Sequence, residues 1–344
     1  MSGERRKKGR QMKNGTWGVR LAPSRSLAPA PGPCRSAYCL RSSVFPQPLA
    51  PRPVLPMDTI FHEVSIVGLG LLGGSWGLAL KKYGLAVRRI GYGRASTVGR
   101  ALAADAVDEG TDDLRKAVRD ADLIILAAPV GAILDCIPRL KEMASSKALV
   151  TDVGSTKRLI CERARETMGD APLFLGGHPL AGKERSGVEN AEATLFANAR
   201  YVLTPLEDRH LEDTRIKAFV SLVTAIGARP HIMDPASHDR ALAFLSHLPQ
   251  LLSSALASLI AEESLESRLP VELAASGFRD VTRLAESPYS VWRDICLTNL
   301  ENIQQAIEAL TEKLEFMKQH LSDQELEREF QQALKLREKL REAG

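Results

Sequence analysis

The sequence feature that most constrains the fold is the segment Val64-Ser65-Ile66-Val67, which is followed by glycines at positions 68, 70 and 73. The four residues before the glycines are mostly β-branched, which predicts a buried strand. The glycines have the G-x-G-x-x-G spacing of a turn that leads into a helix and holds a dinucleotide pyrophosphate. Gly68 permits the tight bend, Gly70 lets a phosphate approach the backbone, and Gly73 lets the helix pack against the strand. Because this spacing also occurs in plain turns, the prediction depends on whether strands and helices alternate in the next part of the chain.

The chain beyond the turn does alternate between helix and strand patterns, which predicts a doubly wound parallel sheet that binds its ligand at the carboxyl edge. Helices are predicted near 71–82, 97–104, 112–119, 132–143, 156–167 and 211–226, and strands near 89–92, 123–127, 148–152, 173–175, 201–203 and 230–233. The predicted cofactor-binding residues lie at the strand ends and in the turn: Gly68, Gly70, Leu71, Leu72, Gly73, Gly93, Arg94, Ser96, Ala128, Pro129 and Val130.

The end of the second strand favours NADP over NAD. An acid often binds the adenosine ribose at this position, but the sequence here has Gly93, followed by Arg94, Ala95, Ser96 and Thr97. A carboxylate would repel a 2′-phosphate, whereas a guanidinium beside hydroxyl groups can accept one. The alternative is that Arg94 is a solvated loop residue and that the site accepts either cofactor.

Charge is distributed unevenly along the chain. Residues 1–57 hold 11 of the 46 Lys and Arg residues but only one of the 42 acids, so the remainder carries a net charge of about −6 and gives no reason to expect nucleic acid. We predict that 1–57 is a disordered basic tail. It is a transit peptide, a nucleic-acid-binding arm, or translated sequence upstream of a start at Met57, and we favour the last because Met57 directly precedes the first strand.

The remaining chain has room for two domains, which we place at 58–234 and 235–344. The second half is predicted to be all helical, with long helices near 241–262 and 291–320. The first of these is apolar around much of its surface, which predicts a helical dimerisation domain and a homodimer. We find no uninterrupted apolar run long enough to span a membrane. The five cysteines and seven histidines have no metal-ligand spacing, so we expect no metal, and a reducing, cytoplasmic location.

Four polar clusters stand out after the glycine turn. In Asp152-Val153-Gly154-Ser155-Thr156-Lys157, Ser155 is either a helix N-cap or a ligand-facing hydroxyl. In the segment 176–187, glycines surround His178, which has a suitable pKa to take a proton from a substrate hydroxyl. The third cluster, Ser237-His238-Asp239 leading to Ser246-His247-Leu248-Pro249-Gln250, places polar groups on an apolar helix. The fourth, 277–283 with Trp292-Arg293-Asp294, contains arginines that either bind a carboxylate or form ion pairs.

These clusters, in this order, resemble the bacterial prephenate and arogenate dehydrogenases of tyrosine biosynthesis. The segments that carry the resemblance are GLGLLGGS, DVGSTK, GGHPLAGKERSG, SHLPQ, GFRDVTR and WRD, and they span about residues 63 to 320. The resemblance implies a Rossmann-type dinucleotide-binding domain, a helical dimerisation domain, and an active site between them.

By this resemblance, His178 accepts a hydrogen bond or proton from the ring hydroxyl of the substrate, and Ser155 contacts the same hydroxyl. Substrate binding is assigned to Arg283, His247, Gln250 and Lys183, and gating of the pocket to Glu184 and Asp280. Lys183 stands where threonine is frequent in the family, and Gln250 where a second histidine is frequent. These two departures leave open the choice between prephenate and arogenate and the question of feedback by tyrosine.

The reaction implied is an oxidative decarboxylation that yields 4-hydroxyphenylpyruvate from prephenate or tyrosine from arogenate, with hydride transfer to NAD(P). Two alternatives remain open: a two-domain dehydrogenase of the β-hydroxyacid type, and a non-catalytic protein that senses nucleotides.

Overall fold

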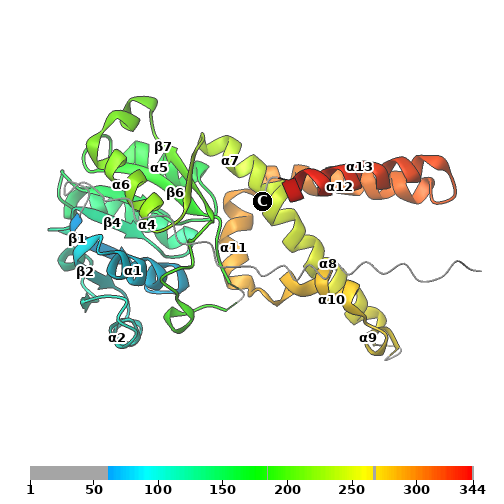
Figure 1. The fold of residues 1–344 in the computed structure, drawn as a ribbon, viewed down its shortest axis with the longest axis horizontal. Coiled ribbons are helices and arrows are strands. Elements are labelled where there is room, and N and C mark those ends of the chain that lie inside the picture. Colours follow the sequence, from blue (N-terminus) through cyan, green and yellow to red (C-terminus); the bar gives the residue numbers. More distant parts are fainter. Residues whose placement is uncertain (1–60, 184, 266–268, 343–344) are drawn as a thin grey trace, which may run out of the picture. The chain divides into compact units, whose positions relative to one another are not determined.

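The computed structural model describes residues 61–183, 185–265 and 269–342. The predicted tail 1–57 and the predicted gating residue Glu184 lie outside these residues. The first half of the described chain is an eight-stranded sheet with helices on both faces, and the second half is helical (Figure 1).

The sheet has the strand order β3-β2-β1-β4-β5-β6-β7-β8. Its strands are β1 (Phe61–Val67), β2 (Ala86–Tyr92), β3 (Glu109–Thr111), β4 (Leu123–Leu126), β5 (Leu149–Asp152), β6 (Leu173–Pro179), β7 (Arg200–Pro205) and β8 (Arg229–Ile232). The six strands from β3 to β6 are parallel, whereas β7 runs antiparallel to β6 and parallel to β8. The predicted parallel sheet is confirmed for these six strands, and the two strands predicted to extend it, β7 and β8, do so in the opposite direction. The short strand β3, which has no apolar residue, was not predicted.

Helices cover the two faces of the sheet. On one face lie α1 (Leu71–Tyr83), α2 (Ala95–Ala103) and α6 (Thr214–Ala225), and on the other α3 (Leu114–Val118), α4 (Val130–Met143) and α5 (Arg158–Thr167). Short 3₁₀ turns, η2 (Val188–Asn190) and η3 (Asp208–Glu212), occupy the connections.

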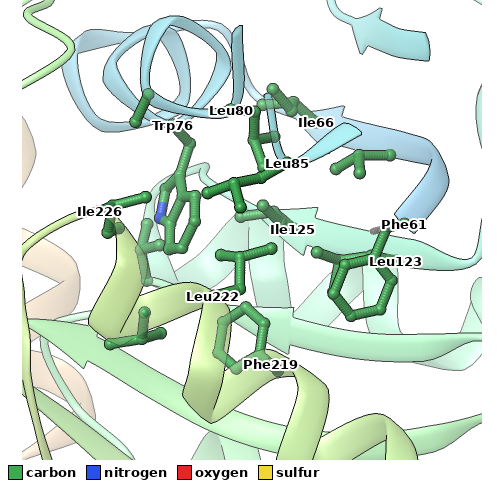
Figure 2. Packing of buried hydrophobic residues seen from close by; sticks show 14 of the residues in the cluster. Phe61, Ile66, Trp76, Leu80, Leu85, Leu123, Ile125, Phe219, Leu222 and Ile226 are labelled. Carbon is green, nitrogen blue, oxygen red and sulfur yellow. The ribbon is translucent and has the colours of Figure 1, made fainter. Parts of the chain in front are cut away.

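Aromatic packing holds α1 in place. Trp76 of α1 is fully buried, with its ring centre 5.2 Å from that of Phe196 and 5.9 Å from that of Phe219 on α6. Figure 2 shows Trp76 beside Leu222 and Ile226, which also belong to this core. Because buried aromatic rings contribute large apolar areas, this cluster fixes the helix that follows the glycine turn.

The helical half begins at α7 (Pro235–Leu242), three residues after the last strand. It continues with the π-helical turn η4 (Ala243–His247), α8 (Leu248–Glu263), α9 (Leu269–Glu272), α10 (Ser276–Thr282), the 3₁₀ turn η5 (Arg283–Glu286), α11 (Tyr289–Thr298), α12 (Leu300–Gln319) and α13 (Gln324–Glu342).

Two of the helices predicted here are interrupted. The predicted helix 241–262 contains the π-helical turn, which precedes Pro249, a residue that has no N–H for α-helical bonding. The predicted helix 291–320 ends at Thr298 and restarts at Leu300, because Asn299 has a non-helical ψ of 30°.

The run Pro235–Glu263 is the single candidate membrane span among the described residues, by length and composition alone. Only 22% of its most apolar window is buried. Polar residues such as His247 and Gln250 interrupt this run, so it is not the uninterrupted apolar stretch that the sequence was expected to lack, and that expectation stays a prediction. Leu245, Leu252 and Leu259 on this run are exposed.

Hydrogen bonds join the helical half to the sheet half. The Asp294 carboxylate on α11 accepts from the backbone N–H of Gly131 at the start of α4, at 3.0 Å. The hydroxyls of Thr156 and Thr298 are 2.8 Å apart, and that of Thr298 donates to the backbone carbonyl of Asp294 at 2.7 Å. All these atoms lie in or next to the edge of the sheet where β4 and β5 end.

Candidate active site

The glycine turn has the shape that a dinucleotide requires. Gly68 has a φ of +102°, and a Cβ there would lie 2.6 Å from the carbonyl oxygen of Ala127. A Cβ on Gly73 would lie 2.0 Å from the Gly68 carbonyl oxygen, so the helix can pack this closely only with glycine. At Gly70, by contrast, a Cβ would meet no protein atom within 4 Å. The turn therefore leaves open space at the N-terminus of α1, where backbone N–H groups favour an anion.

That open space belongs to a cavity of about 920 Å³, here called the glycine-turn cavity. Of the predicted cofactor-binding residues, six line it: Gly68, Gly70, Gly93, Arg94, Ala128 and Pro129. Thr97 and Arg100 of α2 also line it; Thr97 was among the residues predicted after Gly93, whereas Arg100 was not predicted. Ser96 is exposed and does not line the cavity. Successive residues of a helix point in different directions, so Ser96 does not share the side of α2 on which Thr97 lines the cavity.

A smaller cavity of about 200 Å³, here called the Ser155 cavity, adjoins the first. It shares Gly70, Ala128 and Pro129 with the glycine-turn cavity. It also holds three further predicted cofactor residues, Leu71, Leu72 and Val130, together with Ser155. Gly73 lines neither cavity. Predicted cofactor and catalytic residues are thus brought together at one edge of the sheet.

Ser155 is not the N-cap of α5, which was one of the two interpretations of its position. The helix begins three residues later, at Arg158. Its first N–H groups are bonded by the Asp239 carboxylate of α7, at 2.7 Å from the N of Lys157 and 3.0 Å from that of Arg158. A side chain from the helical half therefore provides the cap, and the Ser155 side chain lines a cavity instead.

His178 lies near the carboxyl end of β6 and lines a third cavity, of about 500 Å³, here called the His178 cavity. The ring is buried, with 9% of the residue exposed. Burial lowers the pKa of His178 well below its usual range, and the nearby His238, Lys157 and His247 act in the same direction. His178 is therefore neutral at physiological pH, as a general base must be before it accepts a proton.

A second histidine contacts the first. His178 Nδ1 lies 2.9 Å from His238 Nε2, and His238 Nδ1 lies 2.7 Å from the Asp239 carboxylate. His238 and Asp239 are both fully buried. The sequence marked this pair only as polar residues on an apolar helix, and gave no signal that they face a residue 60 positions earlier.

Below the site lies a buried ion pair between Lys157 and Asp152. The Asp152 carboxylate also accepts from the backbone N–H of Gly154, at 2.8 Å, and from that of Gly177, at 3.0 Å. Because buried charges need such partners, the pair holds the end of β5 against the strand that carries His178.

Two predicted substrate-binding residues, Lys183 and Gln250, line the His178 cavity. Lys183 pairs with Glu192 at 2.5 Å. Gln250 donates to the Leu284 carbonyl oxygen at 2.8 Å, which ties α8 to the turn η5.

His247 is buried next to this cavity rather than among its lining residues. Its Nδ1 is 3.2 Å from the Asn299 amide nitrogen, and its ring packs edge-on to Trp292. Burial lowers its pKa to about 4, which Asp239 partly opposes.

The predicted residues Arg283 and Asp280 are exposed on η5 and α10. Neither lines the cavities described above, although Leu284, next to Arg283, lines the His178 cavity. Their assignments to substrate binding and gating therefore stay predictions.

One group of potential metal ligands lies elsewhere in the described residues, formed by Asp170, Glu207 and His210. Arg209 pairs with both carboxylates, at 2.9 and 2.6 Å. The group is accounted for as an ion-pair network on the surface.

A doubly wound sheet whose glycine turn fits a pyrophosphate, with a buried neutral histidine at the same edge, defines a dinucleotide-dependent dehydrogenase. Comparisons with known proteins agree. Residues 76–232 match the family model described as "Prephenate dehydrogenase, nucleotide-binding domain", and residues 234–336 match "Prephenate dehydrogenase, dimerization domain".

Relatives with these names are similar over most of the chain. A prephenate dehydrogenase of Bacillus subtilis is 32% identical over 80% of this chain and 74% of its own. The crystal structure of the Aquifex aeolicus prephenate dehydrogenase with hydroxyphenyl propionate and NAD+ superposes with a TM-score of 0.74, at 31% identity, over 85% of this chain and all of that one. The Synechocystis arogenate dehydrogenase structure has a TM-score of 0.69 and 33% identity, over 81% and 99%.

The chain therefore belongs to the prephenate dehydrogenase family, as the sequence resemblance predicted. It is an NAD(P)-dependent dehydrogenase with a Rossmann-type domain followed by a helical dimerisation domain.

Proposed function

We propose that the protein catalyses the oxidative decarboxylation of prephenate or arogenate in tyrosine biosynthesis, with hydride transfer to NADP or NAD. The observation that carries the proposal is the position of His178: a buried histidine of lowered pKa that lines a cavity of about 500 Å³ at the carboxyl edge of the sheet. Names of relatives that act on either substrate support the choice of substrates.

The bound nicotinamide supplies a hydride acceptor. The protein residues handle the rest of the reaction. His178 accepts the proton of the substrate hydroxyl as the C4–H bond gives up its hydride, and the C1–carboxylate bond then breaks to release CO₂. The electron pair of that bond completes the aromatic ring, and the resulting phenolate takes the proton back from His178. The histidine thus holds a proton only transiently, which suits a base whose charged form is disfavoured by burial.

The other cavity residues bind and orient the substrate, which is an anion with two carboxylates. Lys183 brings a positive charge to the His178 cavity, and we assign Arg283 on η5 to a substrate carboxylate and Ser155 to the reacting hydroxyl. We assign His247 and Gln250 to the wall of the substrate pocket, and Asp280 and Glu184 to the gating of access to it.

NADP is the favoured cofactor. Gly93 places no side chain just after β2, and Arg94, Thr97 and Arg100 line the glycine-turn cavity. Among the described residues, the Arg94 guanidinium makes no ion pair. These groups suit a 2′-phosphate.

The active protein is a homodimer located in the cytoplasm. The exposed leucines of η4 and α8, Leu245, Leu252 and Leu259, lie within the segment that matches the dimerisation domain, and a second copy would cover them.

A four-way assay tests this function. Purified protein is given prephenate or arogenate, each with NAD or NADP, and reduced cofactor is followed by its ultraviolet absorbance. We expect turnover of at least one substrate and a higher kcat/KM with NADP, and His178→Asn should reduce kcat by about 10²–10⁴-fold. The Arg94→Ala variant should lower kcat/KM with NADP more than with NAD. Absence of turnover in all four arms would refute the function, and a strong NAD preference would refute the cofactor assignment alone.

A further inference from the structure

The base of the proposed reaction belongs to a longer chain of buried hydrogen bonds. It runs from the His178 ring through the His238 ring to the Asp239 carboxylate, with separations of 2.9 and 2.7 Å. His238 and Asp239 lie on α7, in the helical half, and His178 lies on β6 in the sheet half. Neither His238 nor Asp239 lines the His178 cavity, so neither contacts the space in which the substrate would bind.

The hydrogen-bond directions follow from the chemistry at the far end. A carboxylate can only accept, and the Asp239 carboxylate already accepts two backbone N–H groups at the N-terminus of α5, where the helix dipole stabilises negative charge. His238 Nδ1 must therefore carry the proton that points at Asp239. In a neutral ring, His238 Nε2 is then an acceptor, so His178 Nδ1 must donate to it.

This order leaves Nε2 as the unprotonated nitrogen of His178. A neutral imidazole has one basic nitrogen, and a general base needs that nitrogen on the side of the substrate rather than buried in the protein. Without a buried acceptor for Nδ1–H, the two neutral tautomers of His178 would compete, and a fraction of the protein would present an N–H group to the substrate hydroxyl.

From this geometry we infer that His238 and Asp239 are positioning residues that hold His178 in its Nδ1–H tautomer and stabilise the proton it takes up. The inference rests on the proposed function. When the substrate hydroxyl proton moves to His178 Nε2, the Nδ1–H bond to His238 remains, and the negative charge of Asp239 faces the new positive charge across one ring. The proton returns to the phenolate, so the relay undergoes no net change.

A purely structural role is the competing explanation, and it applies unequally to the two residues. Asp239 caps α5, and its carbonyl accepts from Asn299, so its replacement would disturb the joint between the halves whatever its role in catalysis. Among the described residues, the His238 side chain forms hydrogen bonds only with His178 and Asp239. The test is therefore made at His238.

Two substitutions at His238 separate the explanations. His238→Leu removes the acceptor for His178 Nδ1–H. His238→Gln can return an acceptor, because a glutamine oxygen can occupy the position of the histidine Nε2. His231→Leu, at an exposed histidine on β8, is the matched control for loss of a histidine.

We expect His238→Leu to lower kcat by about 10²–10³-fold and to change KM by less than about threefold. The kcat of His238→Gln should be at least about tenfold higher than that of His238→Leu. His231→Leu should match the parent protein. Nitrogen NMR of ¹⁵N-histidine-labelled protein supplies a readout that is independent of turnover. In the parent protein, Nδ1 of His178 should carry the proton and Nε2 should have none, and His238→Leu should shift the population towards the other tautomer.

The inference is overturned if folded His238→Leu keeps kcat within about threefold of the parent protein. It is also overturned if His178 carries its proton on Nε2 in the parent protein, a measurement that needs no variant and holds even if His238→Leu fails to fold. Failure of the proposed function would be recognised separately, because the parent protein would then turn over neither substrate while the NMR experiment still reports the tautomer.

Discussion

Two glycines of the same turn should respond to the same substitution in opposite ways. Gly70→Ala adds a methyl group that meets no protein atom within 4 Å, at a φ of −89° that alanine readily adopts. Gly73→Ala adds one whose Cβ lies 2.0 Å from the Gly68 carbonyl oxygen. The first change should affect binding and leave the fold intact, and the second should destabilise the fold.

The magnitudes depend on what each methyl group displaces. At Gly70 it enters the glycine-turn cavity and keeps the pyrophosphate from a backbone N–H, a hydrogen bond to a charged group worth about 1.5–3 kcal/mol, or about 10- to 150-fold in Kd. At Gly73 the backbone must separate by roughly 1 Å, and forcing extra volume into a packed site costs about 1–3 kcal/mol, or about 2–12 °C in Tm.

Titration calorimetry with NADP and NAD measures the first effect, and thermal unfolding measures the second. Gly99→Ala is the control, because Gly99 is an exposed helical glycine with no atom within 4 Å of an added Cβ, and alanine there should keep both properties or raise Tm slightly. If Gly70→Ala binds both dinucleotides like the parent protein, the turn does not hold the pyrophosphate. An unchanged Tm for Gly73→Ala would contradict the packing argument.

Two further predictions concern buried polar groups between the halves. Thr298→Val should lower the free energy of unfolding by about 1–3 kcal/mol, because the Thr298 hydroxyl donates to Asp294 and is the acceptor for the Thr156 hydroxyl, which the change leaves unpaired. In denaturant unfolding, the double variant with Thr156→Val should lose less stability than the two single variants lose together. Strictly additive losses would contradict the hydrogen bond between the two threonines. The free energy of unfolding should also fall by about 3 kcal/mol between about pH 6.5 and 4 because of His247. In the unfolded chain this histidine takes up a proton near its usual pKa of about 6.5, whereas in the folded chain it stays neutral until about pH 4. His247→Asn should flatten this part of the pH profile of unfolding, and an equally steep profile would rule out His247 as its source.

Local patterns predicted most of the sheet and the cavity residues around it. The strand before Gly68 and the spacing of the glycines depend on neighbours in sequence, and so they could be recognised directly. The short strand β3 was missed because Glu109-Gly110-Thr111 has no apolar residue, and the antiparallel direction of β7 depends on pairing with β6 rather than on its own composition.

Contacts between distant residues explain the remaining differences. Ser155 has the composition of a helix cap, but a carboxylate from α7, Asp239, caps α5. The break at Asn299 coincides with its amide bonds to the Asp239 carbonyl and to His247, which a helical periodicity could not reveal. The contact between His178 and His238 likewise joins residues far apart in the sequence, so no local pattern could predict it.

The histidine relay is divided between the halves of the chain, and this division constrains how the halves can be exchanged. A chimera that joins the sheet half of this protein to the helical half of a relative would take its dinucleotide preference from the first parent. It would assemble a complete base only if the second parent brought a histidine and an acid to the positions of His238 and Asp239. Recombination near residue 234 therefore transfers the dinucleotide preference with the sheet half alone, whereas the catalytic base requires matching residues from both halves.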